Sequence, residues 1–160
     1  MNFVYTANPP AKDAEPLVAN DPWFPAVTPT DVRDAANLDG TATEARLRNA
    51  LRDAFDTVNR ELSDYRERME LAGHATLAEV PARQLDGQSL QVLRYRRAVV
   101  ASVQAQLVDV HREIDTTPHS DGKEGRIRER LDVKRNAHLR ALRLAISDLL
   151  GIARTTVELI

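Results

Sequence analysis

The sequence contains no cysteine, and only 4% of its 160 residues are aromatic. Without cysteine the chain can form neither a disulfide nor a metal site with thiolate ligands, so its stability has to come from packing. A core with so few aromatic residues must be built from Leu, Val, Ile and Ala, which suits packed helices. We therefore expect an all-α protein.

A strong net charge and long apolar segments are also absent. The formal net charge is −2, which gives no general argument for nucleic-acid binding. No apolar run approaches the roughly 18 residues of a membrane span, and residues 1–16 lack the basic start and apolar run of a signal peptide. We expect a soluble protein without membrane contact and with one domain, because 160 residues are few for two.

Five of the eight prolines lie in residues 1–27, which we predict to be an extended N-terminal arm because proline removes a hydrogen-bond donor and restrains φ. This arm carries the only tryptophan, Trp23, directly before Phe24. Two adjacent large aromatic side chains indicate that the arm docks on a surface. Two docking surfaces remain open: the chain's own helices, and a neighbouring subunit.

Residues 28–151 are predicted to form a helical bundle, because apolar residues recur every three or four positions. A short helix begins at Thr28, and three long helices are expected at 41–73, 88–114 and 125–150. Thr41 and Glu44 have the spacing of a capping box at the start of the first long helix, and Gly73 is placed to end it.

A connector, residues 74–87, joins the first two long helices. Thr76 and Glu79 have the spacing to cap a single helical turn, and Asp86-Gly87 is a turn signal. We expect the connector to be held on the bundle by three apolar side chains, Leu77, Val80 and Leu85. It contains His74, for which we expect a helix-cap role rather than chemistry.

The last nine residues, 152–160, read as a strand-like tail because Thr, Val and Ile favour extended backbone. A strand without a partner strand in a helical chain is an open edge, so it favours pairing with another protein. The predicted docking residues are Arg154, Thr155, Thr156, Val157, Glu158, Leu159 and Ile160.

The third long helix is basic in its first part: residues 123–143 carry eight basic and three acidic side chains. This surface either forms ion pairs with the first long helix or contacts a polyanion or an acidic protein. Its residues are Arg126, Arg128, Arg130, Lys134, Arg135, Arg140 and Arg143.

No residue pattern indicates catalysis, a cofactor or a metal. Phosphate-binding glycine loops, nucleophile elbows and Ser-His-Asp spacings are missing from the sequence. Asp115, His119 and Asp121 could approach a metal ion, but they lie in a loop without a rigid frame. We therefore predict a protein that is not an enzyme.

Several short motifs, in this order and at these intervals, resemble the head completion proteins of contractile-tailed temperate phages. The resemblance covers residues 23–160. Its motifs are the Phe24-Pro25 entry, the Arg-Leu-Arg run at 46–48, the Asn-Arg-Glu-Leu run at 59–62, the Val-Pro-Ala and Asp-Gly connector at 80–87, and the Tyr-Arg-Arg-Ala-Val run at 95–99.

This resemblance implies a head-to-tail connector of the virion that is assembled in the host cytoplasm. Such a protein joins the capsid beneath the portal protein after DNA packaging, and it forms a ring with copies of itself, twelvefold in the virion. It retains the genome and receives tail-terminator or neck proteins, and packaged double-stranded DNA passes through the channel without sequence-specific contact. The competing hypothesis from the residues alone is a helical nucleic-acid-binding protein that uses the basic helix at 126–143.

Overall fold

The computed structural model describes residues 17–36, 38, 42–114 and 123–152, and these residues are mostly helical. The all-α fold class predicted from the sequence is confirmed. The elements are α1 (Pro29–Ala36), α2 (Glu44–Glu61), α3 (Ser63–Leu71), the single 3₁₀ turn η1 (Leu77–Glu79), β1 (Gln84–Leu85), β2 (Gln88–Ser89), α4 (Leu90–Ile114) and α5 (Lys123–Leu150). No helix among them is long and apolar enough to cross a membrane.

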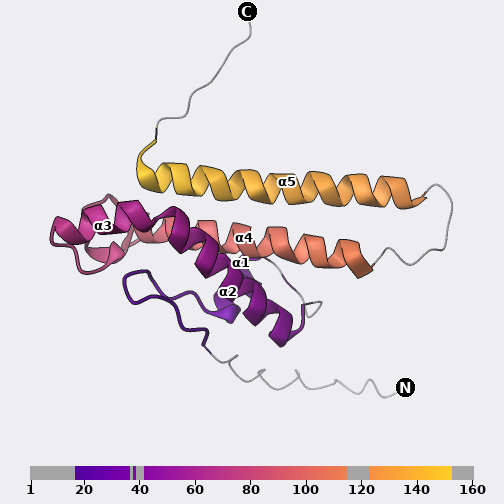
Figure 1. Ribbon diagram of the computed structural model, residues 1–160, viewed down its shortest axis with the longest axis horizontal. Helices are drawn as coiled ribbons and strands as arrows, with labels where there is room; N and C mark the ends of the chain where they lie inside the picture. The colour runs from indigo at the N-terminus through magenta and orange to yellow at the C-terminus, as the bar shows by residue number, and fades with distance from the viewer. Residues whose placement is uncertain (1–16, 37, 39–41, 115–122, 153–160) are drawn as a thin grey trace, which may run out of the picture.

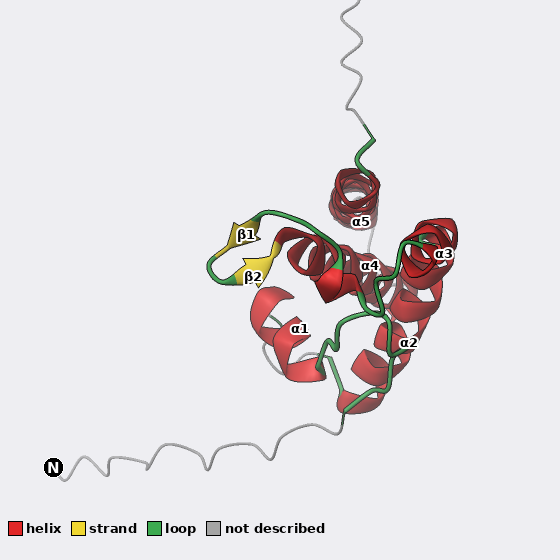
Figure 2. Cartoon of the chain, turned by 90° about the vertical axis from the view of Figure 1, so that its left-hand side faces the viewer, coloured by secondary structure: helices red, strands yellow, loops and turns green. Residues whose placement is uncertain are grey.

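Helix α4 is the centre of the molecule. The antiparallel helix α5 packs along one side of it, and α1 and α2 pack on the other side (Figures 1 and 2). Ala98, Val99 and Val103 of α4 are fully buried between these layers. A helix with partners on two sides needs apolar residues on more than one face, which explains why the apolar pattern of 88–114 is wide.

The core is aliphatic for most of its volume, as the composition predicts. Leu47, Leu51, Leu62 and Leu149 are completely buried or nearly so. Its largest fully buried side chain, however, is Tyr95 of α4. The aromatic residues in the described part of the chain are all buried: Trp23, Phe24, Phe55, Tyr65 and Tyr95.

The first long helix is interrupted, contrary to the prediction of one helix over 41–73. Leu62 leaves helical geometry (φ −100°, ψ 4°), and its N–H donates to the carbonyls of both Val58 and Asn59. The Ser63 hydroxyl donates to the Arg60 carbonyl at 2.9 Å, so this carbonyl has a side-chain hydrogen-bond partner that competes with the regular helical backbone N–H. The apolar spacing continues through the break, because Leu62 and Tyr65 are both buried, so periodicity could not reveal it.

The ends of the helices show which capping predictions hold. Thr43 caps α2, since its Oγ1 accepts the N–H of Arg46, so the assignment of the cap to Thr41 is wrong. Thr28 and Asp31 form a reciprocal capping box at the start of α1, as expected. The Thr28 N–H donates to Asp31 Oδ2 at 2.9 Å, and the Asp31 N–H donates to Thr28 Oγ1 at 3.0 Å. Gly73 follows α3 at φ +93°, which confirms its predicted role as the residue that ends the helix.

The connector contains a small hairpin that the sequence interpretation missed. β1 and β2 pair antiparallel, and the two turn residues, Asp86 and Gly87, both have positive φ (50° and 70°). This is the backbone of a type I′ turn, for which Asp-Gly is a favoured pair. The turn signal was therefore correct, but it closes a hairpin instead of leading directly into α4.

The connector docks through two of its three predicted apolar contacts. Leu77 and Val80 are buried, whereas Leu85 is 61% exposed, so its predicted packing is wrong. The Thr76 side chain makes no cap hydrogen bond. The carboxylate of Glu79 instead accepts the N–H of Ala75 at 3.0 Å.

Candidate functional site

The docking segment of the arm lies on the chain's own helices. Trp23 and Phe24 are 3% and 5% exposed, and their rings meet edge to face with centroids 4.9 Å apart. The Phe24 ring stacks on Tyr95 of α4, also at 4.9 Å, and Trp23 lies edge-on to Tyr65 of α3 at 6.4 Å. Aromatic pairs of this kind contribute roughly 0.5–1.5 kcal/mol each beyond their burial. The four rings join the arm to two helices.

Trp23 also fixes the connector through hydrogen bonds. Its indole N–H donates to the carbonyl of His74 at 3.2 Å, and its own carbonyl accepts the N–H of Leu77 at 2.9 Å. The N–H of His74 in turn donates to the carbonyl of Met69 and closes the end of α3. His74 thus acts through its backbone at the helix end, in the region where a cap role was expected.

A closed ring of three hydrogen bonds lies beside the aromatic rings. The Tyr95 hydroxyl donates to Asn59 Oδ1 at 2.7 Å, Asn59 Nδ2 donates to Asn20 Oδ1 at 3.0 Å, and Asn20 Nδ2 donates back to the Tyr95 hydroxyl at 2.9 Å. Burial raises the pKa of Tyr95 above its ordinary value of 10.0. The hydroxyl therefore stays protonated and available as a donor at neutral pH. Sequence periodicity could not find this network, because its members come from the arm, α2 and α4.

An ion pair holds the outer edge of the arm. Arg66 of α3 contacts Asp21 of the arm and, at 2.9 Å, Glu70 one turn further along α3. Asp21 also shapes the arm locally, because its Oδ1 accepts the N–H of Trp23 at 2.9 Å. The arm is thus positioned by stacking, by hydrogen bonds and by charge.

Gln91, in the first turn of α4, joins three helices at the end of the molecule where α5 finishes. Its Nε2 donates to the Tyr65 hydroxyl of α3 at 3.2 Å and to the Leu149 carbonyl of α5 at 3.3 Å. Burial is the main cause that raises the pKa of Tyr65. A glutamine on a helix carries no signal of such a role in a single sequence. The bond to Leu149 ties the last turn of α5 to the start of α4.

The basic residues of α5 are largely accessible to solvent. Arg126, Arg128, Arg130, Lys134, Arg140 and Arg143 are exposed, and Arg135 is partly buried with an interaction partner. Helix α4 lies between α5 and α2 (Figure 2), so the cluster is placed on the side of the molecule away from the first long helix. Over its full length α5 carries eight basic and four acidic residues.

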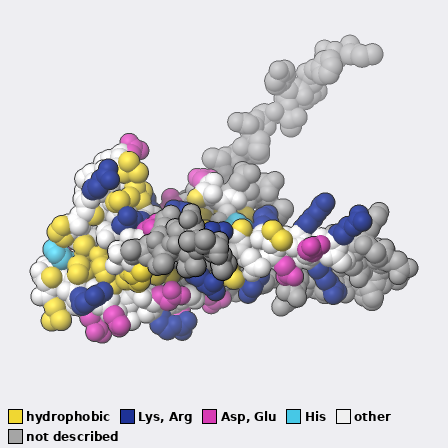
Figure 3. Space-filling view, turned by 90° about the horizontal axis from the view of Figure 1, so that it is seen from above, with side chains coloured by type: hydrophobic (Ala, Val, Ile, Leu, Met, Phe, Trp, Pro, Cys, Tyr) yellow, Lys and Arg dark blue, Asp and Glu magenta, His cyan; other side chains and the backbone are white. Residues whose placement is uncertain are grey.

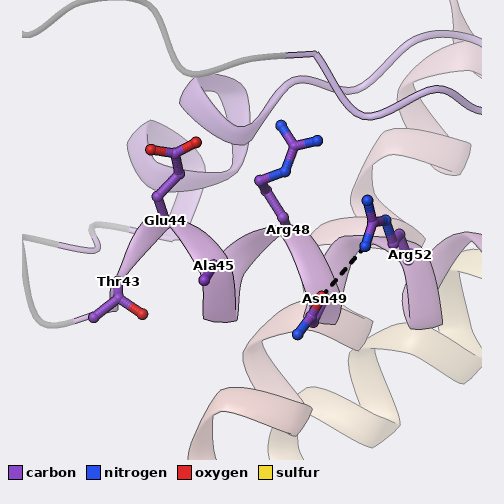
Figure 4. A pocket seen from close by; sticks show the side chains of 6 residues that line it. All are labelled: Thr43, Glu44, Ala45, Arg48, Asn49 and Arg52. Atoms are coloured by element: carbon purple, nitrogen blue, oxygen red, sulfur yellow. Dashed lines mark hydrogen bonds between the residues drawn. The ribbon is translucent and has the colours of Figure 1, made fainter.

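A shallow hollow lies along the first turns of α2 (Figure 4). The side chains of Glu44 and Arg48 extend from the same face of α2. Asn49 lies on a different face of this helix, and its side-chain oxygen accepts a hydrogen bond from Arg52. All its lining residues come from one short stretch: Thr43, Glu44, Ala45, Arg48, Asn49 and Arg52. A ligand site needs groups that converge from several elements, so this hollow is a surface feature.

The part of the chain that the structure describes contains no group of three or more His, Asp or Glu side chains that could hold a metal ion. The loop residues Asp115, His119 and Asp121 lie outside the described residues. So do the seven predicted docking residues, 154–160, and their role stays a prediction.

Comparison with known proteins decides the family. The family described as Phage head completion protein (GPL) matches residues 18–160. The chain belongs to the phage head completion protein family. The head completion/stabilization protein of Escherichia phage P2 is 39% identical over 123 residues, which cover 77% of this chain and 72% of that protein. No solved structure matches. The resemblance inferred from the short motifs is confirmed.

The head completion family match begins at residue 18, and Val18 is the first buried residue in the described part of the arm. Three motifs behind the resemblance meet in the cluster described above: Phe24 stacks on Tyr95, and Tyr95 donates to Asn59. These motifs lie far apart in the sequence, and together they join the arm, α2 and α4. In this head completion protein they therefore contribute to the fold.

Proposed function

We propose that this head completion protein is a structural connector of the phage virion. It joins the capsid beneath the portal protein after DNA packaging, forms a ring with copies of itself, retains the genome and receives the tail-side neck or tail-terminator proteins. The observation that carries the proposal is the family match over residues 18–160. Cytoplasmic assembly and a twelvefold ring that matches the portal belong to the same proposal.

The arrangement of the helices supports a ring. A ring contact is heterologous, because one surface of a subunit meets a different surface of the next. Helices α5 and α2 lie on opposite sides of α4 (Figure 2), and their sequences differ. The excess of basic residues on α5 gives one of these sides a charge that an acidic neighbour would complement.

The C-terminal tail supports portal binding. Residues 154–160 are rich in strand-favouring residues and follow α5 in the sequence, a composition that suits addition as a strand to a sheet of the portal or of a neighbour. A short strand binds weakly alone, but many copies that engage one ring bind together with much higher avidity.

Deletion of residues 155–160 tests the docking role of the tail. We expect loss of co-assembly with the purified portal protein and an unchanged helical circular dichroism spectrum and melting temperature, because Leu149 is the last buried side chain among the residues that the structure describes. Deletion of residues 1–16, which precede the family match, is the matched control and should leave portal binding intact. Portal binding that survives the deletion of 155–160 would contradict the docking role.

The exposed cations of α5 carry a second candidate function, binding of double-stranded DNA. It predicts a mobility shift at low salt that weakens steeply as salt rises, because each Arg–phosphate contact releases counterions. Replacing Arg126, Arg130 and Lys134 with Gln should then reduce the affinity. If the unmodified chain shifts no duplex at low salt, this function is excluded. We favour an acidic protein neighbour, because dense Arg–phosphate contacts would hold DNA that has to slide.

A further inference from the structure

Exposed hydrophobic side chains gather at one end of the molecule. Leu71 at the end of α3, Leu85 in β1 and Ile152 after α5 are 89%, 61% and 57% exposed. They are three of the five large hydrophobic residues exposed in the described residues. Their elements lie at the same end (Figures 1 and 2), where Figure 3 also shows hydrophobic side chains gathered on the left. We call these three residues the end face.

The end face is mounted on a rigid frame. Gln91 links α3, α4 and α5 just behind it, through the Tyr65 hydroxyl and the Leu149 carbonyl. Leu71 precedes the closed end of α3, where Gly73 and the residue after it return their N–H groups to the helix. Side chains that are held in place before binding lose little conformational entropy when a partner covers them.

Charged residues surround the end face. Arg68 lies one turn before Leu71 on α3, and Arg83 and Asp86 flank β1; all three are exposed. An apolar centre with a charged rim is the usual composition of a protein–protein interface. A single exposed leucine is ordinary, but three large apolar residues from three elements at one end indicate an interaction surface.

The position where the described residues end indicates which partner covers this surface. Gly151 has φ +71°, and Ile152 donates its N–H to the Ser147 carbonyl at 2.9 Å. The described residues end at Ile152, which belongs to the end face, and the eight residues 153–160 follow it in the sequence. Eight residues span at most about 29 Å when fully extended. A partner that binds the tail therefore lies within that distance of Ile152, which is part of the end face.

We propose that the end face docks on an apolar surface of the same protein that takes up the C-terminal tail. The inference rests on the proposed function, in which that protein is the portal. The end face then sets the orientation of the subunit, because a rigid surface fixes the direction of α4 and α5 while a tail alone would not.

Binding of purified portal protein to surface variants tests the proposal. The variant carries Leu71→Gln, which keeps a good helix former, and Leu85→Thr, which keeps a strand former. The matched control is Val133→Gln on α5, which is 66% exposed and lies away from the end face. We expect at least tenfold weaker portal binding for the double variant, unchanged binding for the control, and melting temperatures like that of the unmodified chain for both.

The results separate the inference from the proposed function. Portal binding by the double variant with unchanged affinity would overturn the inference and leave the proposed function standing. Absence of portal binding by the unmodified chain would overturn both. Sedimentation of the chain without portal gives a further check: if the double variant loses self-association but keeps portal binding, the end face joins copies of the chain, and the inference is wrong.

Discussion

Replacement of Tyr95 by Phe removes one oxygen atom from the closed hydrogen-bond ring and leaves the stacking on Phe24 in place. The hydroxyl makes two hydrogen bonds, to Asn59 at 2.7 Å and from Asn20 at 2.9 Å. Asn20 Nδ2 keeps a second acceptor, the Pro25 carbonyl at 3.3 Å, whereas Asn59 Oδ1 loses its donor. The cost is therefore one lost hydrogen bond together with one carbonyl oxygen that is left without its donor.

We estimate this cost at about 2 kcal/mol, since a net hydrogen bond contributes about 1 kcal/mol and an unsatisfied buried group costs about 1–3 kcal/mol. For a chain of this size that loss lowers the melting temperature by roughly 4–8 °C. Urea unfolding followed by helical circular dichroism measures the free energy directly.

Tyr65→Phe is the matched control for this experiment. Its hydroxyl accepts one hydrogen bond, from Gln91 at 3.2 Å, and Gln91 keeps the Leu149 carbonyl as a second partner. Its loss should cost less than half as much as that of the Tyr95 hydroxyl. If the free energy of unfolding of Tyr95→Phe lies within about 0.5 kcal/mol of that of the unmodified chain, the closed ring of hydrogen bonds does not stabilise the docked arm.

Three further predictions concern the docked arm, the Tyr95 hydroxyl and the end of α3. Trp23→Leu should lower the free energy of unfolding by about 3 kcal/mol or more. In the unmodified chain Trp23 is the only tryptophan, so its fluorescence should change in the same urea transition as the helical circular dichroism signal. A fluorescence change at lower urea would mean that the arm is not part of the core. Burial raises the pKa of Tyr95 above 10.0, so the protonated hydroxyl stabilises the folded state fully below pH 10, and this stabilisation is lost as the pH rises further. Between pH 8 and pH 11 the free energy of unfolding should therefore fall more for the unmodified chain than for Tyr95→Phe. Equal decreases for the two proteins would contradict this. Gly73 has φ +93°, so Gly73→Ala should lower the free energy of unfolding by about 1 kcal/mol, whereas Gly125→Ala inside α5 should raise it slightly. Equal effects of the two substitutions would refute the role of Gly73 as the residue that ends α3.

The sequence predicted the helices and several of their ends well, because periodicity and capping are local. Thr28, Gly73 and Gly151 end or begin helices where their residue types suggest. The break at Leu62 was missed for a physical reason: the apolar face continues through it, and the signal is a serine hydroxyl that bonds a carbonyl three residues earlier. Residues such as Ser63 are common in unbroken helices, so the sequence alone does not distinguish the two cases.

The candidate site was less accessible to sequence reasoning. The adjacent Trp23 and Phe24 indicated docking but did not identify the surface, which proved to include Tyr95 and the connector. Gln91 carried no signal, because its importance comes from two partners on other helices. Leu85 was expected to be buried by its apolar character alone, whereas the positive-φ turn after it holds β1 at the surface. Contacts between distant segments decide these cases, and one sequence does not contain them.

Electron microscopy of the purified chain mixed with its portal protein tests the central claim most directly. The proposed function predicts a ring of subunits on the portal, and portal particles without added density when residues 155–160 are deleted. The proposed docking of the end face predicts in addition that the end with α3, β1 and the last turn of α5 lies against the portal. Portal particles that stay bare in the presence of an excess of the unmodified, folded chain would contradict the assignment of this protein as a connector.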